Sequence, residues 1–103
     1  EIQNWMEQHY SQNFNLDEVA QHFNLSTRSL IRRFKAALDL APNQYLQAMR
    51  IEAARKQLEQ TDYTVEQIML AVGYNDSSSF RRLFLKKTGL TPLDYRRRFS
   101  RHF

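Results

Sequence analysis

The stretch that decides the fold is GYNDSSSFRRLFLKKTG, residues 73–89, in which three serines and four cations stand among apolar residues. Its surroundings, residues 63–96, align with NLDEVAQHFNLSTRSLIRRFKAALDLAPNQYL, residues 15–46. Before the turn the residue numbers of the two copies differ by 49: Leu16, Val19 and Phe23 match Val65, Ile68 and Val72. After the turn they differ by 50: Leu30, Phe34, Leu40, Pro42 and Tyr45 match Phe80, Phe84, Leu90, Pro92 and Tyr95. The chain therefore contains two copies of one unit, and the turn of the second copy is one residue longer.

The first copy predicts two short helices around a tight turn. Apolar residues from Leu16 to Phe23 have helical spacing and follow an N-cap at Asn15. Ser26 can cap a second helix that buries Leu30 and Phe34. Two helices joined by a short turn that holds an apolar residue are the plan of a helix-turn-helix.

The second copy predicts the same arrangement with stronger signals. Thr64 can cap its first helix, and Gly73 supplies the positive φ that a helix end often needs. Asn75 or Asp76 can cap the second helix. The core side of that helix comprises Phe80, Leu83 and Phe84.

Three further helices complete an all-α, seven-helix, homeodomain-like fold. One covers residues 2–9, one runs from Pro42 to about Gln60, and the last runs from Pro92 to near Ser100. The middle helix has two adjoining apolar stripes, as expected of a long helix that joins two subdomains. The predicted organisation of the single domain, 1–103, is a first helix-turn-helix subdomain at 1–41, a connecting helix at 42–60 and a second subdomain at 61–103.

Composition narrows the class of protein. The chain has 103 residues, 42% of them hydrophobic, and no cysteine, so neither disulfides nor thiolate metal sites are available. No apolar run is long enough to cross a membrane, and the first residues contain no apolar stretch typical of a signal peptide. A start at glutamate rather than methionine indicates a piece of a longer protein. We expect a cytoplasmic, nucleoid-associated location without membrane contact.

The charge is unevenly distributed along the chain. Residues 1–25 contain four acidic residues and no lysine or arginine, whereas residues 26–103 contain all 15 basic residues against seven acidic ones. This segregation favours a positive surface suited to phosphates. A basic but merely solvated surface is the alternative at this point.

The second helix of each copy presents small residues first and arginines one turn later. Small residues let a helix start approach another surface closely, and free N–H groups there suit phosphates. Arginines one turn further reach base edges in a major groove, where Arg pairs with guanine. The predicted base-reading residues are Arg28, Ile31, Arg32, Ser78, Ser79 and Arg82, and the predicted phosphate contacts are Ser26, Thr27, Lys35, Ser77, Arg81 and Lys86.

The duplication itself favours duplex DNA. A helix over residues 42–60 is about 27–29 Å long at about 1.5 Å per residue. This length is comparable with the separation of about 34 Å between successive major-groove segments on one face of B-DNA. A monomer with two such helices could therefore contact two adjacent grooves.

The second copy resembles the DNA-binding region of the AraC/XylS family of bacterial transcription regulators. The same resemblance extends to the first copy, through LSTRSLIRRFKAALDLAPNQYL, and to the connecting helix, through MRIEAARKQL. The resemblance covers essentially the whole chain. The matching positions are Gly73, Tyr74, Phe80, Arg82, Phe84, Lys86, Gly89, Thr91, Pro92 and Tyr95. The resemblance implies a two-motif DNA-binding domain that follows an N-terminal effector or oligomerisation domain. The fragment itself is expected to be a monomer, and the parent protein is expected to contact RNA polymerase if it activates transcription. The stretches TRSLIRRFKA and YRRRF are similar to those of a subgroup of the family whose N-terminal half resembles a glutamine amidotransferase.

The first copy departs from the family pattern. Asp39 stands where the second copy has Gly89, and Ala41 where it has Thr91, so the first copy lacks a glycine stop and a capping hydroxyl. Ile31 fills a position that is often polar, and it either contacts a thymine methyl or packs against its own module. Arg33, where the second copy has Leu83, is expected to form a surface ion pair.

Other functions are less well supported. Serine catalysis needs a base and an orienting acid, and no motif surrounds His9, His22 or His102, so the chain is not predicted to be an enzyme. The same histidines lack the spacing of metal ligands, and no cofactor is predicted. Tyr10, Trp5 and the phenylalanines are expected in the core. The main alternative is a helical protein–protein interaction module with a basic docking face; RNA binding is weaker, because an exposed aromatic platform is lacking.

Overall fold

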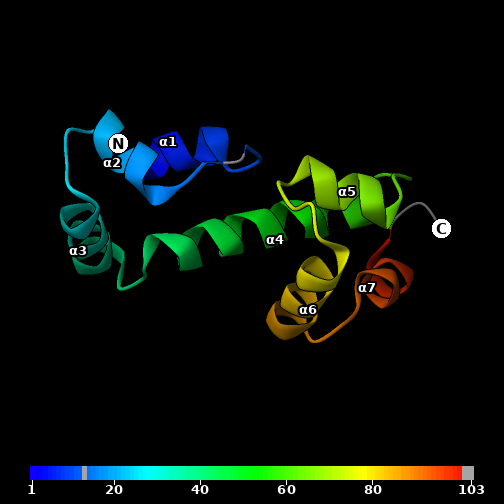
Figure 1. Cartoon of the computed structure of the whole chain (residues 1–103). Coiled ribbons are helices and arrows are strands. Elements are labelled where there is room, and N and C mark those ends of the chain that lie inside the picture. Colours follow the sequence, from blue (N-terminus) through cyan, green and yellow to red (C-terminus); the bar gives the residue numbers. More distant parts are fainter. Residues whose placement is uncertain (13, 101–103) are drawn as a thin grey trace. The chain divides into compact units, whose positions relative to one another are not determined.

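The computed structural model describes residues 1–12 and 14–100, and within them it is all-α, as the sequence predicts. Its seven helices are α1 (Ile2–His9), α2 (Leu16–His22), α3 (Thr27–Leu38), α4 (Pro42–Gln60), α5 (Val65–Ala71), α6 (Ser77–Thr88) and α7 (Pro92–Phe99) (Figure 1). His102 lies outside the described residues. The chain divides inside α4 into two compact units, residues 1–49 and residues 50–103. No helix in the described ranges is both long and apolar enough to cross a bilayer.

Side-chain caps fix the starts of the helices at the predicted residues. Asn15 and Glu18 form a reciprocal capping box at the start of α2, and Thr64 and Gln67 form the matching box at the start of α5. The Thr91 hydroxyl accepts the Asp94 N–H at 3.1 Å and caps α7. At the uncapped Ala41, the Gln44 side chain accepts the backbone N–H at 2.9 Å. The first copy thus replaces the missing hydroxyl with half of a capping box.

Left-handed residues end the helices at equivalent points in the two copies. Gly73 has φ 104° and Gly89 has φ 80°, and their counterparts Asn24 and Asp39 both have φ 57°. Asn and Asp tolerate this conformation better than other non-glycine residues. The first copy therefore makes the same turns as the second without glycine.

The core of the first unit joins α1, α2 and α3. Val19, Ala20 and Leu30 are buried, and half-buried apolar residues from α1, α2 and the turns, including Trp5, pack on them. Tyr45 of α4 lies edge-on to Phe34 with ring centroids 5.2 Å apart. Its hydroxyl donates to Glu7 of α1 at 3.1 Å. Burial and the Glu7 carboxylate raise the pKa of Tyr45.

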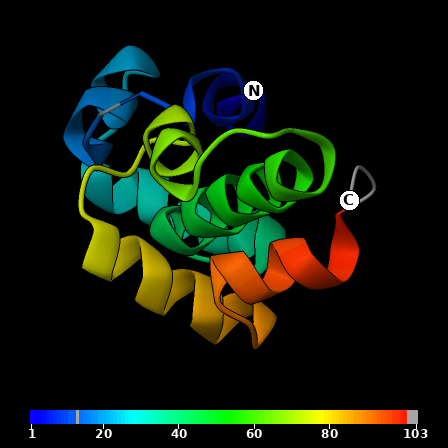
Figure 2. The same cartoon turned by 90° about the vertical axis from the view of Figure 1, so that its right-hand side faces the viewer.

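In the second unit, α5, α6 and α7 surround the C-terminal part of α4 (Figure 2). Phe80 and Phe84 are at most 1% exposed, and Phe84 meets Tyr95 edge-on at 5.6 Å. The Tyr95 hydroxyl accepts from Arg55 Nε at 3.0 Å and donates to Glu59, so it ties α7 to α4. Burial first, and then the Glu59 carboxylate, raise the pKa of Tyr95. Tyr45 and Tyr95, equivalent in the repeat, therefore both bind a glutamate.

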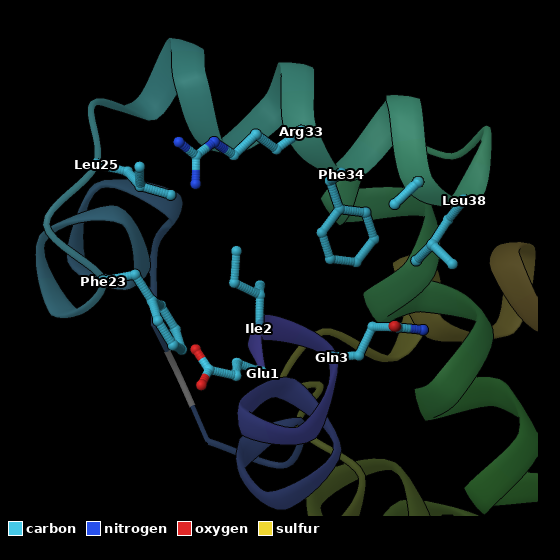
Figure 3. Close-up of a pocket in the computed structure, with 9 residues that line it drawn as sticks. Glu1, Ile2, Gln3, Phe23, Leu25, Arg33, Phe34 and Leu38 are labelled. Atoms are coloured by element: carbon cyan, nitrogen blue, oxygen red, sulfur yellow. The ribbon is translucent and has the colours of Figure 1, made fainter.

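Two core expectations were too simple. Phe99 is 45% exposed, not core, because it lies at the end of α7 and meets Tyr95 through one ring contact. Leu83 is only half-buried. Arg33, its counterpart, forms no ion pair in the described part of the chain and instead lines a cavity of about 370 Å³ with Ile2, Phe23, Leu25 and Phe34 among its walls (Figure 3). The ion pair expected for Arg33 was wrong.

Candidate nucleic-acid interface

The exposed face of α3 is basic. Arg28, Ile31, Arg32 and Lys35 are exposed, and their spacing of three and four residues places them on one stripe. Leu30 and Phe34 are buried on the other side of the helix. None of the three cations forms a hydrogen bond or ion pair within the described residues, so the stripe offers three unpaired positive charges to solvent. Ile31, which was predicted either to contact a base or to pack inward, is 37% exposed.

The exposed face of α6 has the corresponding arrangement. Ser78, Arg82 and Lys86 are exposed and follow one another at four-residue intervals, while Phe80 and Phe84 are buried beneath them. Arg82 and Lys86 form no ion pair within the described residues. Arg82 and its counterpart Arg32 therefore both lie one turn into an exposed helix face.

Leu85 belongs to this face, although sequence reasoning did not include it. It is 47% exposed and lies seven residues after Ser78, directly along the helix. Its counterpart in the first copy is Lys35, at an offset of 50. That offset was the signal that could have identified Leu85. The two faces thus differ at this position, with a cation in one and a leucine in the other.

The start of α3 has a neutral cap. Ser26 accepts the Ser29 N–H at 3.1 Å and its hydroxyl lies 3.0 Å from the Ser29 hydroxyl. The Thr27 hydroxyl donates to the Asp17 carboxylate of α2. The Ser26 and Thr27 hydroxyls are therefore already donating inside the unit, whereas the Ser29 hydroxyl and the backbone N–H groups of the first turn are left for an anion.

The start of α6 has an acidic cap, which settles the choice between Asn75 and Asp76. Asp76 accepts the Ser79 N–H at 3.1 Å and also accepts the Ser79 hydroxyl. These hydrogen bonds from Ser79, with Arg82 as a weaker contribution, lower the pKa of Asp76. The carboxylate is consequently charged at neutral pH. A negative charge thus stands at the helix start where the serines were predicted to meet phosphate.

Arg81 bridges the two helices of the second copy. Its Nε donates to the Ser77 hydroxyl at 2.9 Å, and a terminal nitrogen donates to Glu66 of α5 at 3.0 Å. Glu66 and Ser77 are the counterparts of Asp17 and Thr27, which touch directly in the first copy. In the second copy the Arg81 side chain links the two instead, through one hydrogen bond to each. The counterpart of Arg81 in the first copy is Ile31, whose aliphatic side chain cannot donate such hydrogen bonds.

The structure thus separates the predicted site residues into two sets. One set is exposed and forms no side-chain hydrogen bond or ion pair in the described ranges: Arg28, Ile31, Arg32, Lys35, Ser78, Arg82 and Lys86. The other set has side chains already bonded within its own unit: Ser26, Thr27, Ser77, Ser79 and Arg81. The first set lies on the helix faces and the second at the helix starts and the joints between helices.

The two described histidines, His9 and His22, contact aromatic rings and the backbone. His9 Nδ1 donates to the Trp5 carbonyl at 2.7 Å, and its ring stacks on Trp5 at 4.2 Å. His22 meets Phe23 edge-on at 5.0 Å. In residues 1–12 and 14–100, no three His, Cys, Asp or Glu side chains form a group that could hold a metal ion.

Two helix-turn-helix units, each with a basic face on its second helix, define a double helix-turn-helix domain. A family described as "Helix-turn-helix domain" matches residues 19–98, and the chain belongs to that family. It is 36% identical over 92 residues to the HTH-type transcriptional activator RhaS of Escherichia coli strain SE11, which covers 89% of this chain and 33% of RhaS. The chain therefore spans about a third of the length of the curated relatives it matches.

Solved structures share the fold. An AraC-type transcriptional regulator from Chromobacterium violaceum superimposes with a TM-score of 0.88 at 28% identity, covering 100% of this chain and 92% of that one. The DNA-binding domain of AdpA, in complex with a target DNA, gives a TM-score of 0.91 at 28% identity, covering 95% of this chain and 88% of that one. The fold is thus the AraC-type two-motif DNA-binding fold. The named relatives are described as a transcriptional activator, a transcriptional regulator and a global transcriptional factor.

Proposed function

We propose that this chain is the sequence-specific, double-stranded DNA-binding domain of a bacterial transcription regulator, with α3 and α6 in successive major grooves. The observation that supports this most is the pair of equivalent helix faces, each with an unpaired arginine one turn from its start. The structural likeness to AdpA, whose DNA-binding domain is seen with a target DNA, supports the same class of ligand. Within this arrangement, residues 1–41 and 61–103 act as subdomains joined by 42–60.

The exposed residues divide into base readers and phosphate anchors. Arg28, Arg32 and Arg82 are long, charged and unpaired, and arginine pairs bidentately with guanine in the major groove. Ile31 and Ser78 add shorter contacts to base edges, with the aliphatic side chain of Ile31 suited to a thymine methyl. Lys35 and Lys86, further along their helices, neutralise phosphates as point charges.

The residues at the helix starts act mainly through their backbones. The hydroxyls of Ser26, Thr27 and Ser79 are bonded inside the protein, so we expect the N–H groups of the first turn to contact phosphate. Within the described residues the Ser77 hydroxyl only accepts, from Arg81 Nε, so its proton remains available for a phosphate oxygen. Arg81 contributes least, because Glu66 already balances its charge. The acidic Asp76 cap makes this helix start less favourable for phosphate than the neutral Ser26 cap.

The test is selection from random duplexes. The chain should enrich a site of about 15–20 base pairs that contains two short blocks one helical turn, about 10 base pairs, apart. Enrichment of a single block would limit base readout to one copy. Failure to enrich any sequence, together with tight binding to an acidic protein, would instead favour a protein-interaction module with a basic docking face.

Lys86 is expected to contribute charge without base preference. Lys86→Ala should weaken binding to all duplexes alike and reduce the slope of log K against log salt by about 1, because one counterion fewer is released. Titrations of a selected and an unrelated duplex at several salt concentrations measure both quantities. Lys56→Ala, an equally exposed lysine on α4, is the matched control. A loss confined to the selected duplex would show that Lys86 reads bases.

The parent protein is proposed to be longer and to work at the nucleoid in the cytoplasm. The chain covers 33% of RhaS, which supports an additional region in the parent for an effector or for oligomerisation. The wording TRSLIRRFKA and YRRRF supports a glutamine-amidotransferase-like type for that region, and the full-length sequence tests this directly. RNA polymerase is the proposed partner where the parent activates transcription, as RhaS is described to do.

A further inference from the structure

A second cavity, in residues 50–103, has a cationic rim. It measures about 390 Å³ and is lined by residues of α4, α6 and α7 and by the turn after α6. Arg55, Lys87 and Arg98 come from these three helices, and among the described residues no aspartate or glutamate lines the cavity. Lys87 and Arg98 are exposed and form no hydrogen bond or ion pair within the described residues.

The floor of this cavity is apolar and open. Tyr95 and Phe99 lie with ring centroids 4.7 Å apart, and Phe99 is 45% exposed beside the half-buried Leu90. A Cβ placed on Gly89 would meet nothing within 4 Å, so the turn is open at this residue. The Phe99 ring and the cations of Lys87 and Arg98 line the same cavity, so one ligand can contact all three.

The carboxylates of this unit near the cavity are already bonded. Glu52 pairs with Arg55 at 2.9 Å, Glu59 accepts the Tyr95 hydroxyl, and Asp94 lies 3.5 Å from Arg97. Because these acids have partners, the positive charge of Lys87 and Arg98 is not balanced inside the described part of the unit. The rim of the cavity is therefore complementary in charge to an anionic ligand.

DNA bound through the proposed face of α6 does not provide that anion. Lys87 follows Arg82 by five residues, which is about 140° around the helix, whereas Lys86 is only about 40° away from Arg82. Lys86 therefore shares the face of Arg82, and Lys87 points to a different side. A phosphate would in any case pair with the cations and leave the Phe99 ring uncovered.

We infer that this cavity binds an acidic protein segment, in which one aromatic or aliphatic side chain covers Phe99 and Leu90 and flanking carboxylates pair with Lys87 and Arg98. Such a segment would contact both the apolar floor of the cavity and its cationic rim. Aromatic anchors surrounded by polar contacts are typical of protein-interaction hot spots. The inference depends on the cavity and not on DNA binding, so either can fail without the other.

Nuclear magnetic resonance on the ¹⁵N-labelled chain tests this site without DNA. The probe is the peptide acetyl-Asp-Asp-Phe-Asp-Asp-amide. It should shift the amide resonances of Gly89, Leu90 and Phe99 saturably, whereas the peptide with Asn in place of each Asp, or with Ala in place of Phe, should bind at least tenfold more weakly. Equal binding of the three peptides, or shifts spread over the whole basic surface, would overturn the inference.

Paired variants separate the cavity from general charge. Lys87→Ala with Arg98→Ala should raise the dissociation constant at least tenfold, and Lys56→Ala with Arg33→Ala, which removes the same charge from exposed sites outside the cavity, should leave it unchanged. All four sites are exposed, so the ¹⁵N spectrum should remain that of the folded chain. An equal loss in the two variants would reject the inference. Displacement of the peptide by inorganic phosphate would assign a small-anion site, and displacement by a selected duplex would assign the cavity to DNA.

Discussion

Phe84→Ala should lower the free energy of unfolding by about 3–5 kcal/mol, the usual cost of removing a buried aromatic ring. Phe84 is 0% exposed and sits between Phe80, at 6.0 Å, and Tyr95, at 5.6 Å. Its removal leaves a cavity where α6 meets α7, because the helices that hold these rings cannot close completely. A loss of this size is a large part of the total stability of about 5–15 kcal/mol expected of a small domain.

Urea denaturation followed by circular dichroism measures this effect, and Phe99→Ala is its matched control. The control removes the same side chain from α7 of the same unit, but from a site that is 45% exposed. We expect a loss of about 1 kcal/mol or less there, because little apolar area returns to water. Similar losses for the two variants would contradict the burial pattern of the second unit.

Arg32→Ala and Arg82→Ala should each weaken binding to a selected duplex by about 1–3 kcal/mol, the value of one bidentate base contact. Each arginine is exposed, unpaired and one turn into its helix. Because the two belong to different copies, each variant should lose discrimination in a different block of the site. Binding measured on duplexes with each block scrambled in turn shows which block has become irrelevant.

Arg33→Ala is the control for Arg32. Arg33 is the next residue of α3, is equally exposed and lines the cavity on the inner side instead of the basic face. It should change binding only through its charge, with discrimination of both blocks intact. If Arg32→Ala and Arg82→Ala relaxed the same block, or neither did, the assignment of base readers would be wrong.

Much of the helical framework was predictable because its signals are local. Asn15, Ser26, Thr64 and Thr91 cap helices through contacts three residues away, and such contacts do not depend on the rest of the chain. Pro42 begins α4, and this signal is also local, because the fixed φ of proline suits the first residue of a helix. The buried rings Phe80 and Phe84 followed from helical spacing alone.

The candidate site was less predictable, because its side chains meet across helices. Thr27 and Asp17 are ten residues apart, and Arg81 and Glu66 are fifteen apart. Whether such pairs touch depends on how two helices pack, which spacing within one helix does not indicate. The same reason applies to Phe99, whose ring was assigned to the core from its residue type but lies at an exposed helix end.

The sequence by itself therefore determined the duplication, the helix limits and the two basic helix faces, since each depends on residue type and on periodicity along one helix. The tertiary structure alone decided which hydroxyls and arginines are already bonded, that Leu85 joins the face of α6, and that Lys87 and Arg98 flank one open ring. These features arise where separate helices meet, and only the packed chain brings their side chains together.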